Sequence, residues 1–200
     1  MLISEPNTAY GLALDAFMAS HGAHDVPGTY HAVRKLAYFS SGERSPEAVI
    51  RTGRGACTAK HILLRDLLRR QGEVAEVELV EGDFAAGMPQ AASMSAPLRD
   101  MIRDAGVADY HCYVLWQNAG QAVRLDATWP NAMAVHGFPV NVGWAGTGDT
   151  MLAITPNGTT RRAEDVITAK AELLSGLSAD QADKRRRFLT LLSDWIATVS

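Results

Sequence analysis

The segment from Thr52 to Gly72, TGRGACTAKHILLRDLLRRQG, most strongly constrains how this 200-residue chain can fold. Its leucine and isoleucine residues recur at helical spacing and form a wide apolar stripe, and its charged side chains lie mostly on the opposite side. A helix with so broad an apolar face must pack against another large apolar layer. Glycines precede the helix at 53 and 55, and Gly72 is placed to end it.

Cys57 lies at the start of this helix, which we expect at about Ala56. The unpaired N–H groups and the positive end of the helix dipole favour a thiolate over a thiol at such a position. Together with the turn at Gly55, the N–H of Cys57 could hold an oxyanion formed when the sulfur attacks a carbonyl. The same position also suits a small buried core cysteine, so the rest of the chain must decide.

Helical patterns occupy both ends of the chain. Over residues 7–22, Leu12, Ala16 and Ala19 lie near one face, and Gly22 can end the helix. Residues 29–39 form a second candidate, and a third runs between an N-cap at position 45 and a glycine at 53. The last helix is predicted from a capping box and an apolar repeat at Ser178, Gln181, Phe188, Leu192, Trp195 and Val199.

Strand patterns occupy the middle of the chain. Residues 73–82 alternate, residues 110–117 and 122–128 flank the turn sequence NAGQ, and residues 151–155 form a short further candidate. Helices, then strands, then helices indicate an α+β fold with an antiparallel sheet, in one domain over residues 1–200. The basic run KRRR on the last helix is expected to be a solvated face.

The composition narrows the classes of function. A net charge of −3 offers no basic field for nucleic acid, and no apolar run is long enough to span a membrane. The first residues lack the pattern of a signal peptide, so a cytoplasmic location is expected, with both cysteines kept as thiols. No phosphate loop or dinucleotide fingerprint is present, and we expect no cofactor and no metal.

His111 and Asp126 lie on the two arms of the predicted hairpin. Counted back from its turn, they fall at roughly facing positions, which suits a carboxylate that orients an imidazole. A charged aspartate within VRLDAT needs a partner in a half-buried strand, and His111 would be that partner. A histidine held in this way is a good general base for a cysteine on an adjacent helix.

These two blocks together resemble the transglutaminase-like superfamily. The resemblance rests on Gly55, Cys57, His111, Asp126 and Thr128 and covers about residues 50–130. It implies a papain-like core, in which the nucleophile helix packs on an antiparallel sheet, here with additional N- and C-terminal helices. It also implies a triad in which the cysteine is the nucleophile, the histidine is base and acid, and the aspartate orients the histidine.

The implied reaction is acyl transfer through a thioester acyl-enzyme. We expect hydrolysis of an amide or peptide first and a transglutaminase-type transfer second. The partner would be a small-molecule, peptide or protein amide substrate. The alternatives are an acyltransferase similar to arylamine N-acetyltransferases and a non-catalytic binding module on the same fold. A departure from the family is Tyr113, which stands where relatives often carry Trp.

Other residues compete for a role. His61, one helical turn after Cys57, is a rival base that lacks an evident orienting partner, and a zinc site lacks the usual paired spacing. Cys112 should face away from His111 and be structural. Long connections over 83–96 and 130–149 are expected to border the cleft. Tryptophans 116, 129 and 144 suit the core or cleft wall, and the candidates for that wall are Trp129, Tyr113 and Trp144.

Overall fold

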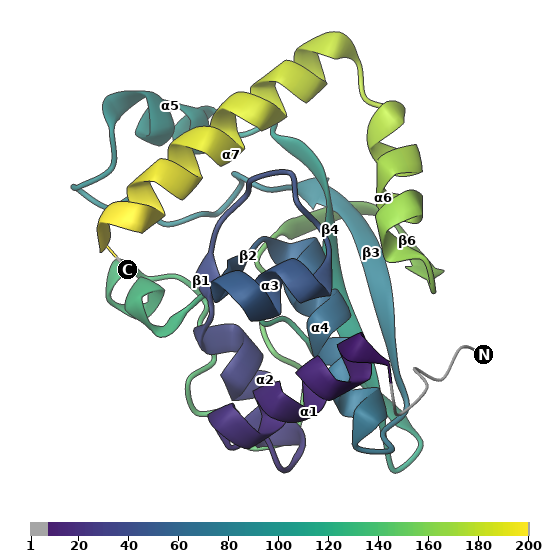
Figure 1. The fold of residues 1–200 in the computed structure, drawn as a ribbon. Helices are drawn as coiled ribbons and strands as arrows, with labels where there is room; N and C mark the ends of the chain where they lie inside the picture. Colours follow the sequence, from purple (N-terminus) through teal and green to yellow (C-terminus); the bar gives the residue numbers. More distant parts are fainter. Residues whose placement is uncertain (1–7, 200) are drawn as a thin grey trace.

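A computed structural model describes residues 8–199 of the chain (Figure 1). The helices are α1 (Ala9–His21), α2 (Val26–Lys35), α3 (Pro46–Thr52), α4 (Cys57–Arg70), α5 (Ala96–Asp104), the 3-10 helix η1 (Asn131–His136), α6 (Val166–Ser175) and α7 (Ala179–Val199). The strands are β1 (Ala37–Tyr38), β2 (Arg54–Gly55), β3 (Ala75–Asp83), β4 (Ala108–Asn118), β5 (Gln121–Leu125) and β6 (Thr155–Ala163). Strands β3 to β6 form an antiparallel sheet in the order β5-β4-β3-β6, whereas β1 and β2 pair in parallel.

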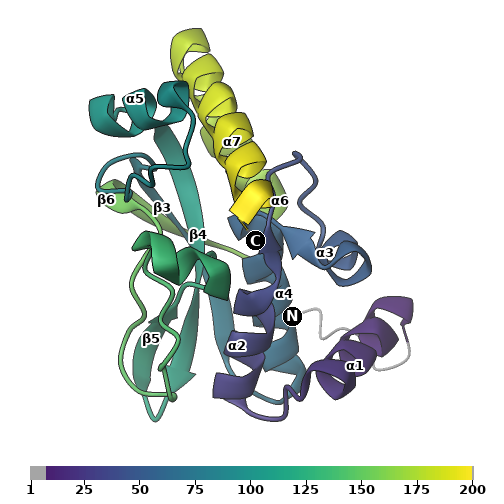
Figure 2. The ribbon, with the colours of Figure 1, turned by 90° about the vertical axis from the view of Figure 1, so that its left-hand side faces the viewer.

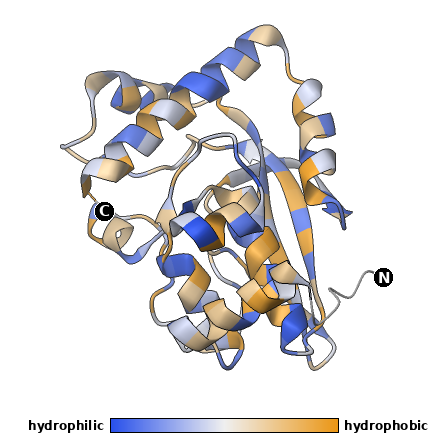
Figure 3. Ribbon diagram, in the orientation of Figure 1, coloured by the Kyte–Doolittle hydropathy of each residue, from blue (hydrophilic) through white to orange (hydrophobic). Residues whose placement is uncertain are grey.

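Helix α4 packs on one face of this sheet. Figure 2 shows the sheet on one side of the molecule and α1 to α4 gathered on the other. The leucines and isoleucine of α4 are buried in one apolar cluster with α1, α2 and residues of β3, β4 and β5. Figure 3 shows the matching apolar residues along α4 and the strands behind it. The expected α+β architecture, with the Cys57 helix on an antiparallel sheet and further helices at both ends, is confirmed.

A second apolar cluster occupies the opposite face of the sheet. It combines α5, the segments that follow β3 and β5, and one side of α7. In Figure 1, α7 and α5 lie together across one end of the molecule. The buried residues of α7 are Phe188, Leu189, Leu192, Ser193, Trp195 and Ile196. The apolar repeat predicted for the last helix therefore marks its buried side.

Local capping signals set the ends of the helices as predicted. The Ser45 hydroxyl accepts from the N–H of Ala48, and Gly53 ends α3 in the left-handed region. Before α7, the N–H of Ser178 donates to Gln181 Oε1 and the N–H of Gln181 donates to Ser178 Oγ, which is a complete capping box. Within residues 8–199, no helix is both long and apolar enough to cross a membrane.

The predicted face of the first helix is wrong. Helix α1 ends at Gly22 as expected, but its buried residues are Gly11, Leu14 and Phe17. Leu12 is 58% exposed, and Ala16 and Ala19 also face solvent. A helix rich in alanine and leucine on several sides has a weak amphipathic pattern, so periodicity alone does not select the side that packs.

The strand predicted over residues 151–155 is also wrong, because the strand there is β6, from Thr155 to Ala163. Its residues are exposed except for the half-buried Ala163, and it pairs with β3 at the edge of the sheet across a bulge between Val80 and Gly82. Because backbone hydrogen bonds hold this edge strand, it needs no alternating apolar pattern and tolerates Pro156.

The basic run of the last helix is only partly a solvated face. Arg186 is exposed and pairs with Asp183, as expected for a solvated residue. Arg185, however, lies against β4 and donates through Nε to the buried Asp109 at 2.8 Å. Lys184 donates to the carbonyl of Ala105. The prediction fails for Arg185 because the run of basic residues gives no information about Asp109, the buried carboxylate that lies opposite in the folded protein.

Gly55 is required by close packing. A Cβ at this position would lie 2.7 Å from Cγ2 of Val49, a β-branched side chain with little freedom to move. We expect Gly55→Ala to lower the free energy of unfolding by about 1–3 kcal/mol, measured by denaturant unfolding. Gly143→Ala, where a Cβ meets nothing within 4 Å, is the matched control. Equal midpoints for the two variants would contradict this reading.

Candidate active site

The structure brings Cys57, His111 and Asp126 together. Cys57 is the first residue of α4, His111 lies in β4, and Asp126 directly follows β5. His111 Nε2 lies 2.7 Å from Asp126 Oδ2 in a buried hydrogen bond. Ala56, the residue before α4, makes no side-chain cap, so no side chain competes for the N–H groups of the first turn. All three side chains are buried, with Cys57 and Asp126 each 4% exposed.

The carboxylate of Asp126 is held from three sides. Besides His111, its Oδ2 accepts the N–H of Ala153 at 2.7 Å, and its Oδ1 accepts the N–H of Thr128 at 3.0 Å. Burial opposes its charge, but the charge and hydrogen bond of His111, with a smaller contribution from His61 at 3.5 Å, hold the pKa of Asp126 well below its usual range. The β4–β5 pairing ends at Val114 and Leu125, so Asp126 reaches His111 diagonally and not from the directly facing position.

The imidazole of His111 has one nitrogen held by Asp126 and one without a partner. Its Nδ1 is buried and makes no hydrogen bond within the described residues. The ring of Phe84 stacks on it at a centroid distance of 6.0 Å. Burial would lower the pKa of His111, but the charges of Asp126 and Cys57 and the hydrogen bond to Asp126 raise it to about 10. These surroundings favour the imidazolium form of His111 at neutral pH.

The Cys57 sulfur lies among donors and cations. The Thr58 hydroxyl lies 4.0 Å from Cys57 Sγ and 3.6 Å from Cys112 Sγ, and Lys170 Nζ is 3.6 Å from Cys57 Sγ. A hydrogen bond from Cys112 and the charges of Lys170 and His111 hold the pKa of Cys57 well below its usual range, against the effect of burial. The site therefore favours a thiolate beside an imidazolium.

Cys112 and His111 point to opposite faces of β4. Cys112 belongs to the cluster beneath α4, whereas His111 packs on Phe84, a member of the second cluster. His111 also packs on His61 of α4 at a centroid distance of 5.8 Å, and Cys112 is a neighbour of the Cys57 sulfur, so the two side chains are not fully separated. Burial and the hydrogen bond to Cys57 raise the pKa of Cys112, so the protonated thiol is the donor of this pair.

His61 uses both of its ring nitrogens for other contacts. Its Nδ1 donates to the carbonyl of Cys57 at 2.7 Å, and its Nε2 accepts the N–H of Ala127 at 2.8 Å. Neither nitrogen is available to take a proton from the thiol, which argues against His61 as the rival base. Instead, His61 connects the first turn of α4 to the segment that carries Asp126.

Two buried lysines beside the triad carry no signal in the sequence. Lys170 of α6 is 2% exposed and lies 3.6 Å from Asp109 Oδ1, which Arg185 of α7 also contacts. Lys60 of α4 is fully buried and donates to the carbonyls of residues 34, 36 and 128. Burial lowers the pKa of Lys60 to about 7. Isolated lysines within helical patterns resemble surface residues, so only the tertiary structure reveals them.

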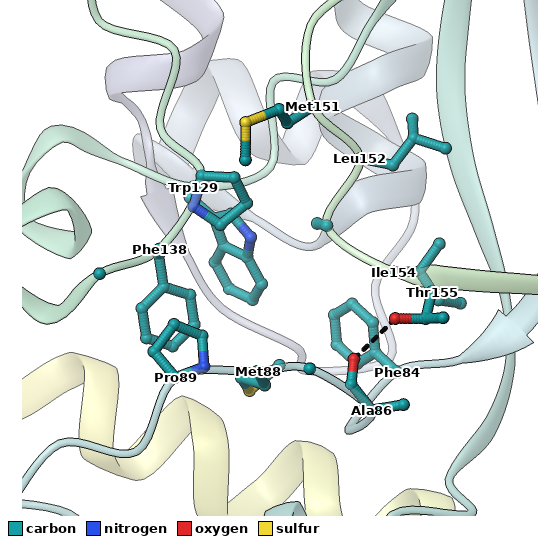
Figure 4. Close-up of a pocket in the computed structure, with 14 residues that line it drawn as sticks. Phe84, Ala86, Met88, Pro89, Trp129, Phe138, Met151, Leu152, Ile154 and Thr155 are labelled. Carbon is teal, nitrogen blue, oxygen red and sulfur yellow. Dashed lines mark hydrogen bonds between the residues drawn. The ribbon is translucent and has the colours of Figure 1, made fainter.

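A cavity of about 220 Å³, lined by uncharged residues, lies beside the triad. In Figure 4, the rings of Trp129, Phe138 and Phe84 border the same space. Phe84 stacks on His111 at a centroid distance of 6.0 Å and on Trp129 at 5.9 Å, so one cavity wall contacts the triad. The lining residues come from 84–89, 129, 137–139 and 151–155, so parts of both long connections border it.

The other proposed wall residues lie elsewhere. The hydroxyl of Tyr113 donates to Glu78, and Trp144 packs on Tyr30 in the cluster around α4. Neither residue lines the cavity, whereas Trp129 does. Trp116 also lies in the cluster around α4. Both tryptophans fill space between the sheet and the helices, a position that their aromatic character alone does not distinguish from a cleft wall.

Comparisons with known proteins supply little further information. No protein-family model matches the sequence, and no curated protein matches it significantly. A search of solved structures finds a chain described as "a Putative Cysteine Protease from Cytophaga hutchinsonii", with 16% identity and a TM-score of 0.39. The match covers 58% of this chain and 37% of that chain. A similarity at this level does not identify the family or the function of this chain.

We expect Asp126→Asn to lower the pKa of His111 by about one to three pH units, because the carboxylate charge that favours the imidazolium is lost. An NMR titration of the labelled imidazole measures this pKa. Asp149→Asn is the matched control, since Asp149 pairs with Arg124 in the same region. A His111 resonance that titrates identically in Asp126→Asn and the wild type would show that the carboxylate does not set its charge.

Proposed function

We propose that this protein is a cysteine-dependent acyl-transfer enzyme in which Cys57 is the nucleophile, His111 the general acid and base, and Asp126 the orienting residue. The proposal rests on the different surroundings of the two ring nitrogens of His111. Its Nε2 is committed to a buried carboxylate, whereas its Nδ1 is buried without a hydrogen-bond partner among residues 8–199, and the charge of Cys57 acts on the same ring. This is the arrangement that nucleophilic catalysis by a thiol requires.

The proposed reaction begins with a thiolate–imidazolium pair. The Cys57 sulfur attacks the carbonyl carbon of an amide or thioester, and the carbonyl π electrons move to oxygen. The N–H groups at the start of α4 are the donors available to this oxyanion. As the tetrahedral intermediate collapses, the bond to the leaving group breaks and His111 supplies the proton from Nδ1. Cys57 then carries a thioester.

A second nucleophile completes the cycle. His111, now neutral, takes a proton from water or an amine, which attacks the thioester and releases Cys57 as a thiolate. Water makes the enzyme a hydrolase, and an amine makes it a transferase. We propose hydrolysis first, on a core of transglutaminase-like type. The alternatives from the sequence are an acetyl-CoA-dependent acyltransferase and a binding module without turnover.

The test is to trap the acyl-enzyme. We expect a small acyl thioester to acylate Cys57 and not Cys112, as found by mass spectrometry of the digested protein, and Cys57→Ala to abolish turnover. The rate should rise with pH as Cys57 ionises and fall again near pH 10, because His111 then loses the proton that it must give to the leaving group.

Each outcome separates the candidates. Acylation of Cys57 by acetyl-CoA in preference to simple thioesters and amides would favour the acyltransferase. A correctly folded protein whose Cys57 is never acylated would overturn the enzyme proposal and favour the binding module. Equal acylation of Cys57 and Cys112 would show that the thiol is reactive without being selected by the site.

We propose that the cavity beside Phe84 receives an uncharged, apolar group of the substrate. None of its fourteen lining residues is charged, and its aromatic walls suit a ring or a branched alkyl group. Met151 is 62% exposed at its margin, so a substitution there should not disturb folding. A cationic side chain at this position should attract a carboxylate.

We therefore expect Met151→Lys to raise the ratio of kcat/KM for carboxylate-bearing over benzyl-bearing thioesters by about three- to fivefold. An exposed ionic contact of this kind stabilises binding by up to about 1 kcal/mol. Val142→Lys is the matched control, because Val142 is 60% exposed and does not line the cavity. The same ratio in both variants would place the substrate elsewhere.

A further inference from the structure

Lys170 is a charged residue at the reacting atom that the triad does not include. Helix α6 buries Val166, Ala169 and Lys170 along one side. This side places Lys170 Nζ 3.6 Å from Cys57 Sγ, in a position where the lysine is 2% exposed. A buried ammonium is costly unless it meets an anion, so its neighbours must explain it.

One carboxylate does not account for this lysine. Asp109 Oδ1 lies 3.6 Å from Lys170 Nζ, but the same carboxylate accepts from Arg185 Nε at 2.8 Å and Nη2 at 3.3 Å. The N–H of Tyr110 also donates to Asp109 Oδ1 at 2.7 Å. Arg185 is therefore the closer cationic partner of Asp109, and Lys170 is directed both to this carboxylate and to the Cys57 sulfur.

The charges around the sulfur balance when it is a thiolate. The titratable groups whose charges act on it are Lys170 from α6, Arg185 from α7, Lys60 from α4, Tyr38 from β1, and His111 and Cys112 from β4. Asp109 lies beside Lys170, and Asp126 lies behind His111. Lys60 is held by three carbonyl groups. The other three cations are Lys170, Arg185 and protonated His111. The carboxylates of Asp109 and Asp126 supply two negative charges, and a Cys57 thiolate supplies the third.

We propose that Lys170 is a second cationic partner of Cys57 that stabilises the thiolate independently of His111. Lys170 contacts the reacting sulfur and would be a catalytic residue. Because it does not have to give up a proton during the reaction, it would preserve the thiolate when His111 is neutral. The inference rests on the proposed role of Cys57 as nucleophile, and it adds a residue outside the region of family resemblance.

The test is a pH titration of the thiolate without any substrate. Ultraviolet absorbance of the thiolate, with that of Cys57→Ala subtracted, reports the ionisation of Cys57. We expect Lys170→Met to raise the midpoint by about one pH unit or more, and the double variant with His111→Ala to raise it further than either change alone. Lys184→Met is the matched control, since Lys184 donates to the carbonyl of Ala105 and does not contact Cys57.

A second variant guards against misfolding of Lys170→Met. Asp109→Asn removes the competing carboxylate, so it should lower the midpoint of Cys57, a shift opposite to that of the lysine variant. A merely structural disturbance would not produce opposite shifts. Midpoints that stay at the wild-type value in both variants, or that move in the same direction, would overturn the proposal. Failure to turn over amides or thioesters, with these shifts intact, would count against the proposed function alone.

Discussion

The buried carboxylate of Asp126 is the interaction on which the arrangement of the site depends. Its side chain accepts three hydrogen bonds, its carbonyl accepts the hydroxyl of Tyr30 at 3.0 Å, and its N–H donates to Thr150 Oγ1 at 2.7 Å. A buried carboxylate that lost these partners would cost several kcal/mol. Asp126 therefore connects three parts of the chain: helix α2, the β4–β5 hairpin and the segment before β6. These contacts hold the carboxylate in place, and the carboxylate orients the His111 ring.

The parts of the site that could be predicted depend on local signals. The glycine turn and the leucine stripe place Cys57 at the start of a packed helix. The turn at Ala119 and Gly120, both with positive φ, produces the hairpin that brings His111 and Asp126 together. Each signal spans a short stretch of chain and follows from backbone geometry or periodicity. The juxtaposition of the three residues could thus be predicted, although the diagonal approach of Asp126 could not.

The parts that could not be predicted depend on contacts between distant segments. Lys170 looks like any lysine of a surface helix until α6 lies over Cys57. Arg185 belongs to a basic run whose other members meet solvent or a carbonyl group. Strand β6 is held by backbone hydrogen bonds to β3, and such pairing requires no particular pattern of side chains. In each case, the deciding partner lies far away in the sequence, and neither composition nor periodicity identifies it.

The position of Lys170 and Arg185 in the last two helices has a consequence for the newly made chain. Translation proceeds from the N-terminus, so the β4–β5 hairpin leaves the ribosome before α6 and α7 are complete. Until these helices dock, Asp109 lacks both of its cations and Cys57 lacks the proposed second cation. The order of synthesis then keeps the thiol less ionised until α6 and α7 have docked, and the most nucleophilic form of the sulfur arises only in the folded protein.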